Sequence, residues 1–210
     1  GKVLVNGQVA GMGQQVEETD TVQVGKKILQ GKQTQKVLAF YKPVGVTCTE
    51  RDPHAEKKIM DMIRYPERLT YAGRLDKDSE GLILLTNDGD LINAMMRGAN
   101  RHEKEYIVKT DREITPDFLE KMAKGIYLKD LDITTRECEI EQIGKFTFRI
   151  VLTQGVNRQI RRMCEACGYR VKALKRIRIM NILLGDLKPG KWREITGEEL
   201  EQEVKGFGKE

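Results

Sequence analysis

Residues 81–86, GLILLT, form an uninterrupted apolar run that stops at the turn sequence Asn87-Asp88-Gly89. An apolar run of this length between turn signals is typical of a buried strand. Other short segments also read as strands: VLAFYKP from Val37, LTYAG ending at Gly73, KEYIVKT at 104–110, and a hairpin over 132–153 with its turn at Gly144-Lys145. Because these strands are mostly joined as hairpins, the sequence predicts an α+β fold around a largely antiparallel central sheet.

Helical patterns are fewer than strand patterns. We expect helices at 55–63, after a capping Asp88, at 116–124, after a capping Asn157, and after a capping Thr196. The stretch YRVKALKRIRIMNILL, residues 169–184, alternates basic and apolar residues and is expected to be extended.

The start of the chain is set apart from this body. Asn6-Gly7 is a two-residue hairpin signal, and residues 21–24 alternate as a strand, so 1–24 is expected to be a small β unit. Residues 25–36 are rich in Gly, Lys and Gln and are predicted to be a linker. The main domain is then expected at 37–204, with a disordered tail at 205–210.

Composition narrows the class of protein. No apolar run approaches the roughly 18 residues that span a bilayer, and the chain does not open on a secretory segment. We therefore expect a cytoplasmic protein with reduced thiols and no membrane partner. Cys164 and Cys167 form a single C-x-x-C, which favours buried helix residues over a zinc site. Without heptads or a large apolar stripe, a monomer is expected.

Positive charge is concentrated in one segment. The net charge is +5, and residues 155–178 hold eight basic residues against Glu165, so 8 − 1 = +7 and the rest of the chain sums to −2. The basic residues are Arg158, Arg161, Arg162, Arg170, Lys172, Lys175, Arg176 and Arg178. Such a segment is typical of a contact with a phosphate backbone, and the alternative is a solvated basic face.

Three short motifs suggest chemistry. In GRLD, Leu75 is expected to anchor a loop between two strands, and Arg74 helps to keep Asp76 ionised. Tyr106, in KEYIVKT, is either half-buried packing or a stacking platform for an unpaired base. Arg158, Arg161 and Arg162 have helical spacing on one face, so they need carboxylates or phosphates as partners.

In this order and spacing, GRLD, KEY and NRQIRRM resemble the RsuA-type pseudouridine synthases. KPVG at 42–45 and LKRIRIMNILLGDLKPGKWREIT at 174–196 fit the same family, so the resemblance covers residues 37–200. The segments KDSEGL, NDGD and RGANRHEKEY are most similar to those of the RluF subgroup. Members of that subgroup modify large-subunit (23S) ribosomal RNA and in some cases transfer RNA. Residues 1–24 resemble the second half of an S-four-type RNA-binding domain without its first two helices.

The resemblance implies a role for each matching residue. Asp76 would be the essential carboxylate at the ribose of a target uridine, either adding to the sugar or removing a ribose proton. Arg161 would pair with Asp76, and Tyr106 would stack on the flipped uracil and assist removal of the carbon-5 proton. Leu174 would line the base pocket. The remaining expectations concern substrate binding, by Lys42 and Arg74 at the cleft and by Arg158, Arg162, Lys175, Arg176 and Arg178 on the RNA backbone. The reaction requires neither metal nor cofactor.

Two alternatives stay open at this point. One is a non-catalytic RNA-binding or ribosome-assembly module that keeps the fold. The other is a glycosidase-like enzyme, which needs a second catalytic carboxylate. Asp78 and Glu80 are near Asp76 in sequence, but we do not expect them to be aimed at the same atom.

Overall fold

The computed structural model describes residues 2–17, 19–30, 35–49, 57–97, 102–195 and 199. The chain divides into two compact units, Gly1–Gln35 and Lys36–Glu210. This boundary is one residue from the predicted start of the main domain. Among the described helices, none combines the length and the apolar character needed to cross a membrane.

The first unit is a four-stranded antiparallel sheet with the order β2-β1-β3-β4. Its strands are β1 (Val3–Val5), β2 (Gln8–Val9), β3 (Val22–Val24) and β4 (Lys27–Gln30). Asn6 and Gly7 have φ of 50° and 83°, which confirms the predicted tight hairpin. The linker prediction is wrong for residues 27–30, because Gly25 (φ 61°) and Lys26 form a second tight turn that pairs β4 with β3.

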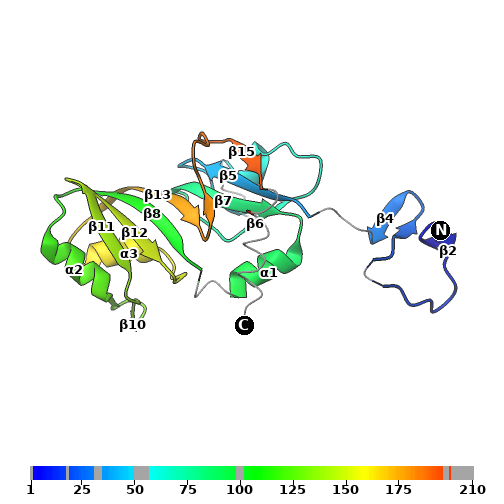
Figure 1. Ribbon diagram of the computed structural model, residues 1–210, viewed down its shortest axis with the longest axis horizontal. Coiled ribbons are helices and arrows are strands. Elements are labelled where there is room, and N and C mark those ends of the chain that lie inside the picture. The colour runs from blue at the N-terminus through cyan, green and yellow to red at the C-terminus, as the bar shows by residue number, and fades with distance from the viewer. Residues whose placement is uncertain are drawn as a thin grey trace. The chain divides into compact units, whose positions relative to one another are not determined.

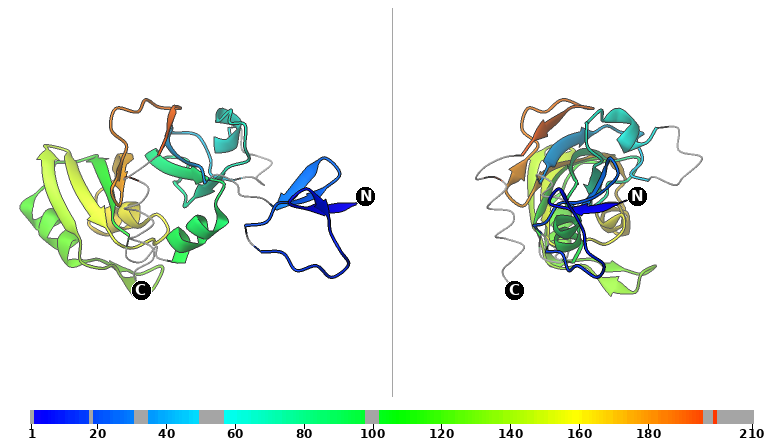
Figure 2. Two further views of the ribbon diagram at one scale, coloured as in Figure 1. Left: turned by 45° about the vertical axis from the view of Figure 1, so that its right-hand side comes forward. Right: turned by 90° about the vertical axis from the view of Figure 1, so that its right-hand side faces the viewer.

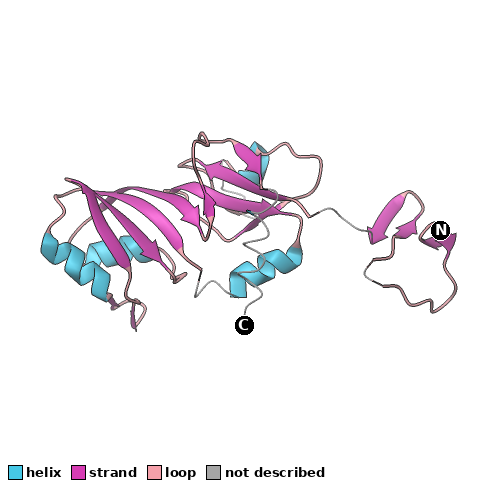
Figure 3. Cartoon of the chain, viewed as in Figure 1, coloured by secondary structure: helices cyan, strands magenta, loops and turns pink. Residues whose placement is uncertain are grey.

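The described part of the second unit contains more strands than helices (Figure 3). Seven of them follow the order β11-β12-β8-β13-β7-β5-β15 in a nine-stranded sheet, in which β14 also pairs with β13 and β6 with β7 (Figure 1). The bounds are β5 (Val37–Lys42), β6 (Thr70–Ala72), β7 (Glu80–Thr86), β8 (Lys104–Thr110), β11 (Glu139–Gly144), β12 (Thr147–Leu152), β13 (Val171–Ile179), β14 (Ile182–Leu183) and β15 (Trp192–Glu194). The pairings are antiparallel except that between β13 and β7, which confirms the predicted fold class.

The parallel pairing of β7 with β13 depends on a glycine. Gly81 lies opposite Arg176 and has a φ of 110°. A Cβ atom at residue 81 would overlap the carbonyl oxygen of Arg176 and lie 2.7 Å from its backbone nitrogen. Only a residue without a side chain allows these two strands to approach so closely.

Helices cover parts of this sheet. Helices α2 (Pro116–Lys124) and α3 (Gln159–Ala166) pack on β8, β11, β12 and β13, where their apolar residues form one core cluster (Figure 2). A second cluster packs the 3₁₀ turn η1 (Ile59–Met62) on β5 and β7. Helix α1 (Gly89–Arg97) begins as predicted, since the carboxylate of Asp88 accepts bonds from the N–H groups of Asp90 and Leu91 at 2.8 and 3.1 Å.

Three predicted elements differ from the structure. Among the described residues of 55–63 only η1 is helical, because Lys58 is extended and bridges to Thr47. The first part of the predicted 132–153 hairpin pairs elsewhere, as β10 (Ile133–Thr134) with β9 (Tyr127–Leu128). Asn157 does not cap α3, because the N-cap is Arg158 in a left-handed conformation. The helix predicted after Thr196 and the tail 205–210 lie outside the described residues, apart from residue 199.

Candidate functional site

A cleft of about 540 Å³ opens where the loop between β6 and β7, strands β8 and β13, and the start of α3 meet. Seven of the predicted site residues line it: Arg74, Asp76, Tyr106, Arg158, Arg161, Leu174 and Arg176. Four do not, namely Lys42, Arg162, Lys175 and Arg178. The structure therefore brings together the residues of all three sequence motifs.

The loop that carries Asp76 is fixed at both sides of this residue. Leu75 is buried in the core cluster beneath the loop, as predicted. The N–H of Ser79 donates to the carbonyl of Asp76 at 3.1 Å, and the N–H of Gly45 donates to that of Lys77 at 2.7 Å. The side chain of Asp76 remains about one-third exposed, at 34%. Its carboxylate is therefore held at the cleft without being buried.

Two arginines of α3 face this loop, but not in the predicted pairing. Arg158 donates two bonds to Asp78, at 3.0 and 2.9 Å, and its Nη1 lies 3.5 Å from Oδ2 of Asp76. Arg161 donates to the carbonyl of Asp78 at 2.8 Å and to Oγ of Ser79 at 3.2 Å. The predicted ion pair of Arg161 with Asp76 is therefore replaced by one from Arg158. The left-handed N-cap turns Arg158 toward the loop, and Arg161 follows one helical turn later.

Asp78 shares a partner with Asp76. Both carboxylates contact the guanidinium of Arg158. The bond from Arg158, followed by the charge of Arg161, holds the pKa of Asp78 below its usual value. Glu80, in contrast, accepts a bond from the hydroxyl of Tyr41 at 3.0 Å. Burial, and then this bond, raise the pKa of Tyr41 to about 12.

The third arginine of the helical motif points elsewhere. Arg162 pairs with Asp130, and its Nε donates to the carbonyl of Asn157 at 2.9 Å. The repulsion that the sequence indicated among the three arginines is thus relieved by carboxylates of this chain. Arg162 is therefore not placed to contact RNA at the cleft.

The floor of the cleft is built from β8 and β13. Tyr106 pairs across the strands with Arg176, and Val108 pairs with Leu174. Leu174 is buried, and Tyr106 is half-buried against two core clusters. An aromatic ring beside an aliphatic side chain suits the stacking of a flat base, which was the predicted role of these two residues.

A β-bulge on β13 separates two arginines that the sequence pattern placed together. The register shifts between Arg176 and Arg178, so Arg176 faces the cleft beside Tyr106 while Arg178 lies opposite Glu105. Arg176 is only 4% exposed, and its Nε donates to the carbonyl of Leu82 at 2.7 Å. The charge of Arg176 thus lies inside the sheet at the cleft, and its contact with the RNA backbone stays a prediction.

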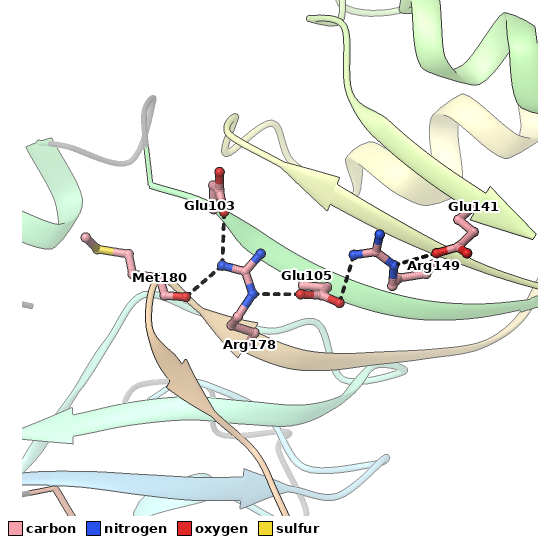
Figure 4. A network of polar contacts seen from close by, with 6 residues as sticks. All are labelled: Glu103, Glu105, Glu141, Arg149, Arg178 and Met180. Atoms are coloured by element: carbon pink, nitrogen blue, oxygen red, sulfur yellow. Dashed lines mark hydrogen bonds and ion pairs between the residues drawn. The ribbon is translucent and has the colours of Figure 1, made fainter. Parts of the chain in front are cut away.

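Arg178 belongs to a network of charged groups on the other face of this sheet (Figure 4). It donates to Glu105 at 2.6 Å, to Glu103 at 3.0 Å and to the carbonyl of Met180 at 2.7 Å. Arg149 continues the network, with bonds to Glu105 at 3.1 Å and to Glu141 at 3.2 Å. Arg178 is thus paired with carboxylates of this chain and lies outside the cleft lining, and its contact with RNA stays a prediction.

The lysines are also redistributed. Lys42 is fully buried, and its Nζ donates to the carbonyls of Pro43 and Val46 at 2.9 and 2.8 Å, so it shapes the loop after β5. Lys175 lies 5.8 Å from the ring centre of Tyr41. Lys104 was missed by the sequence reasoning, although it lines the cleft two residues before Tyr106 on the same strand face. Burial, and then the charge of Arg176, lower the pKa of Lys104 to about 8.

The described part of the chain places no three His, Cys, Asp or Glu side chains close enough together to hold a metal ion. Within the C-x-x-C, Cys164 is fully buried in α3. Burial raises the pKa of its thiol to about 12, so this sulfur stays protonated and is a poor metal ligand.

Comparisons with known proteins converge on one family. A model described as RNA pseudouridylate synthase matches residues 36–166. The chain is 44% identical over 202 residues to the dual-specificity RNA pseudouridine synthase RluF of Escherichia coli strain K12, which covers 95% of this chain and 69% of that protein. It is 34% identical over 209 residues to the ribosomal large subunit pseudouridine synthase B of Vibrio cholerae, covering 93% and 64%.

A solved structure agrees with these relatives. The crystal structure of a pseudouridylate synthase matches with a TM-score of 0.76 and 27% identity, over 97% of this chain and 89% of the other. The match therefore includes the whole sheet that carries the cleft.

Proposed function

Because the chain belongs to the RNA pseudouridylate synthase family, in its RsuA-type branch, and is thus an isomerase acting on RNA, we propose that it converts a specific uridine of large-subunit ribosomal RNA to pseudouridine. The named activity of the Vibrio relative supports this substrate. The dual specificity in the name of the Escherichia relative supports a second RNA substrate, for which we propose transfer RNA.

The observation that carries this proposal is the meeting of Asp76 and Tyr106 in one cleft. They come from a loop and from a strand that are not neighbours in the sheet, and Leu174 of the intervening strand β13 lies beside them. A carboxylate next to an aromatic and aliphatic floor suits a nucleotide that has left its base stack. The ribose would then lie at Asp76 and the uracil on Tyr106.

The reaction breaks the bond between uracil nitrogen 1 and ribose carbon 1, turns the base, and joins carbon 5 to the ribose with loss of the carbon-5 proton. The bond cleavage requires an ionised carboxylate at the sugar, as in glycoside chemistry. Asp76 supplies this carboxylate, and Nη1 of Arg158 lies 3.5 Å from its Oδ2. The hydroxyl of Tyr106 is the candidate for assisting removal of the carbon-5 proton.

The structure changes our choice of RNA-binding residues. With Arg162, Arg176 and Arg178 engaged inside the protein, the backbone contacts are assigned to cations at the cleft. These are the exposed Arg74 and Lys77 in the loop and Lys104 on β8. Phosphates on either side of the target nucleotide would meet this rim.

The test is tritium release from RNA that carries carbon-5-tritiated uridine. Wild type is expected to release tritium from ribosomal RNA transcripts, and Asp76→Asn is expected to abolish release while RNA binding and the unfolding temperature stay near wild type. Asp117→Asn is the matched control, because Asp117 is an exposed residue of α2 outside the cleft lining and makes the same loss of charge. RNA binding by the wild type without release from any transcript would contradict the proposal.

A further inference from the structure

The loop between β6 and β7 holds two aspartates, Asp76 and Asp78. They differ in the number of contacts that they make with the same two arginines. Asp78 accepts both Nη groups of Arg158, and its Oδ2 lies 3.3 Å from Nε of Arg161. Its backbone carbonyl accepts a further bond from Arg161. Asp76 has a single ion pair among the described residues, through one oxygen at 3.5 Å.

We propose that Asp78 is a positioning residue that holds Arg158 and Arg161 and thereby leaves the carboxylate of Asp76 open to the substrate. The inference rests on the proposed function in so far as Asp76 is the carboxylate that acts at the ribose. Asp78 itself has no role at the reacting atoms in this scheme, and it acts through the two arginines.

Because Arg161 is largely buried, the loss of Asp78 would change the contacts of Asp76. Its side chain is only 15% exposed, so its charge needs an anion close by. If Asp78 lost its charge, Asp76 would be the carboxylate left in the loop for both guanidinium groups. An arginine and a carboxylate readily form a two-pronged pair, which occupies both oxygens of the acid. A carboxylate occupied in this way is less available to act on a sugar.

The backbone of Arg158 points to the same arrangement. Its φ of 52° and ψ of 32° are left-handed, which is uncommon for a residue with a long side chain. This conformation delivers the guanidinium between the two carboxylates, where the bond to Asp78 stabilises it. Conformational strain of this kind tends to be kept at functional sites.

Several charged groups act on Asp76, from different elements. Arg158 and Arg161 come from α3, and Lys42 comes from β5. Other charges line the same cleft, namely Arg74 and Lys77 in the loop, Lys104 on β8 and Arg176 on β13. All of these are cationic, so Asp78 is the anion that balances them beside Asp76. If Asp78 were neutral, these cations would therefore have Asp76 as their remaining partner in the loop.

The experiment compares Asp78→Asn, which removes the charge at constant shape, with Asp78→Glu, which keeps it. In Asp78→Asn we expect kcat for tritium release to fall about 10- to 100-fold with little change in KM, because only the catalytic geometry is disturbed. At one fixed pH, the ¹³C resonance of the Asp76 carboxyl carbon, assigned with Asp76→Asn, should move from its wild-type position, because this carboxylate would then pair with the arginines. Asp78→Glu should restore the wild-type resonance, and Asp117→Asn should leave both readouts unchanged.

The two readouts separate this inference from the proposed function. If wild type released no tritium from any RNA, the proposed function would fail, and the carboxyl resonance of Asp76 would still decide the role of Asp78. An unchanged Asp76 resonance in Asp78→Asn, or an unchanged kcat in an active enzyme, would overturn the inference. Combining Asp78→Asn with Arg158→Gln should cost less than the product of the single losses in kcat, and independent effects would also contradict it.

Discussion

At the scale of single residues, the arrangement of the site depends on which carboxylate or carbonyl group each arginine contacts. Arg158, Arg161 and Arg162 share one short segment of chain, yet they engage Asp78, the backbone of the same loop, and Asp130. Their proximity in sequence predicted a common anion. In the structure each of them has a different set of partners, because the left-handed N-cap turns the first arginine away from the helix face.

Lys104 gives a residue-scale prediction about pH. Its pKa is lowered to about 8, so it loses its proton as the pH rises through 8, whereas an unfolded lysine stays charged up to its usual value of 10.5. If Lys104 contacts phosphate, RNA affinity should fall between pH 7 and pH 9 at constant salt, measured with the inactive Asp76→Asn protein.

The matched control for this measurement is Lys104→Arg in the same inactive background. Arginine remains charged over the whole range, so its RNA affinity should change much less between the two pH values. As the pH rises, the effect of Lys104 on the free energy of unfolding has the opposite sign to its effect on RNA affinity. The folded protein disfavours the charged amine, so Lys104 should add stability as the pH rises from 8 toward 10.5. An equal loss of affinity in both proteins would assign the pH dependence to other groups.

At the scale of elements, the sequence predicts strands well and their distortions poorly. The strands at 37–42, 80–86 and 104–110 lie where apolar runs and alternation indicated, and Asp88 caps the next helix. The bulge on β13 has no such signal, because alternation continues through Arg176 and Arg178. One extra residue in a strand reverses the faces of the residues that follow it, so Arg178 lies on the opposite face of the sheet from Arg176.

The site follows the same rule. GRLD, Tyr106 and Leu174 could be assigned from the sequence, and the structure places them in one cleft. The contacts that Arg158 and Arg161 make with this loop could not be assigned without coordinates. These depend on the turn at residues 76–79 and on one φ angle at Arg158, which the sequence pattern does not determine.

Gly81 gives the prediction at the scale of elements. Gly81→Ala should lower the free energy of unfolding by about 2–4 kcal/mol, because it combines backbone strain with an overlap between two strand backbones. Urea denaturation would measure this change. Gly89→Ala is the control, since Gly89 has ample space around it and no left-handed φ, and its effect should stay within about 0.5 kcal/mol. Equal stability of the two variants would mean that β7 and β13 can separate freely at this position.

At the scale of the whole molecule, catalysis and the N-terminal sheet belong to different units. Each lining residue of the cleft lies in unit 2, after residue 35. We therefore predict that a protein of residues 36–210 keeps the unfolding temperature of this unit and its kcat, while its KM for RNA rises because residues 1–24 resemble part of an RNA-binding domain. Thermal unfolding and tritium release would check this, and loss of cooperative unfolding would show that the boundary is misplaced.

The parallel pairing of β7 with β13 also determines when the cleft can be completed during synthesis of the chain. Arg176 and Leu82, which are bonded across these strands, are 94 positions apart. At roughly ten residues per second, Asp76 would leave the ribosome about ten seconds before the strand that completes its cleft. Until β13 has been made, β7 can pair only with β5 and β6 in the described sheet. The floor of the cleft then lacks the strand that carries Leu174. An RNA-modifying enzyme built in this order has no complete cleft until its synthesis is nearly finished.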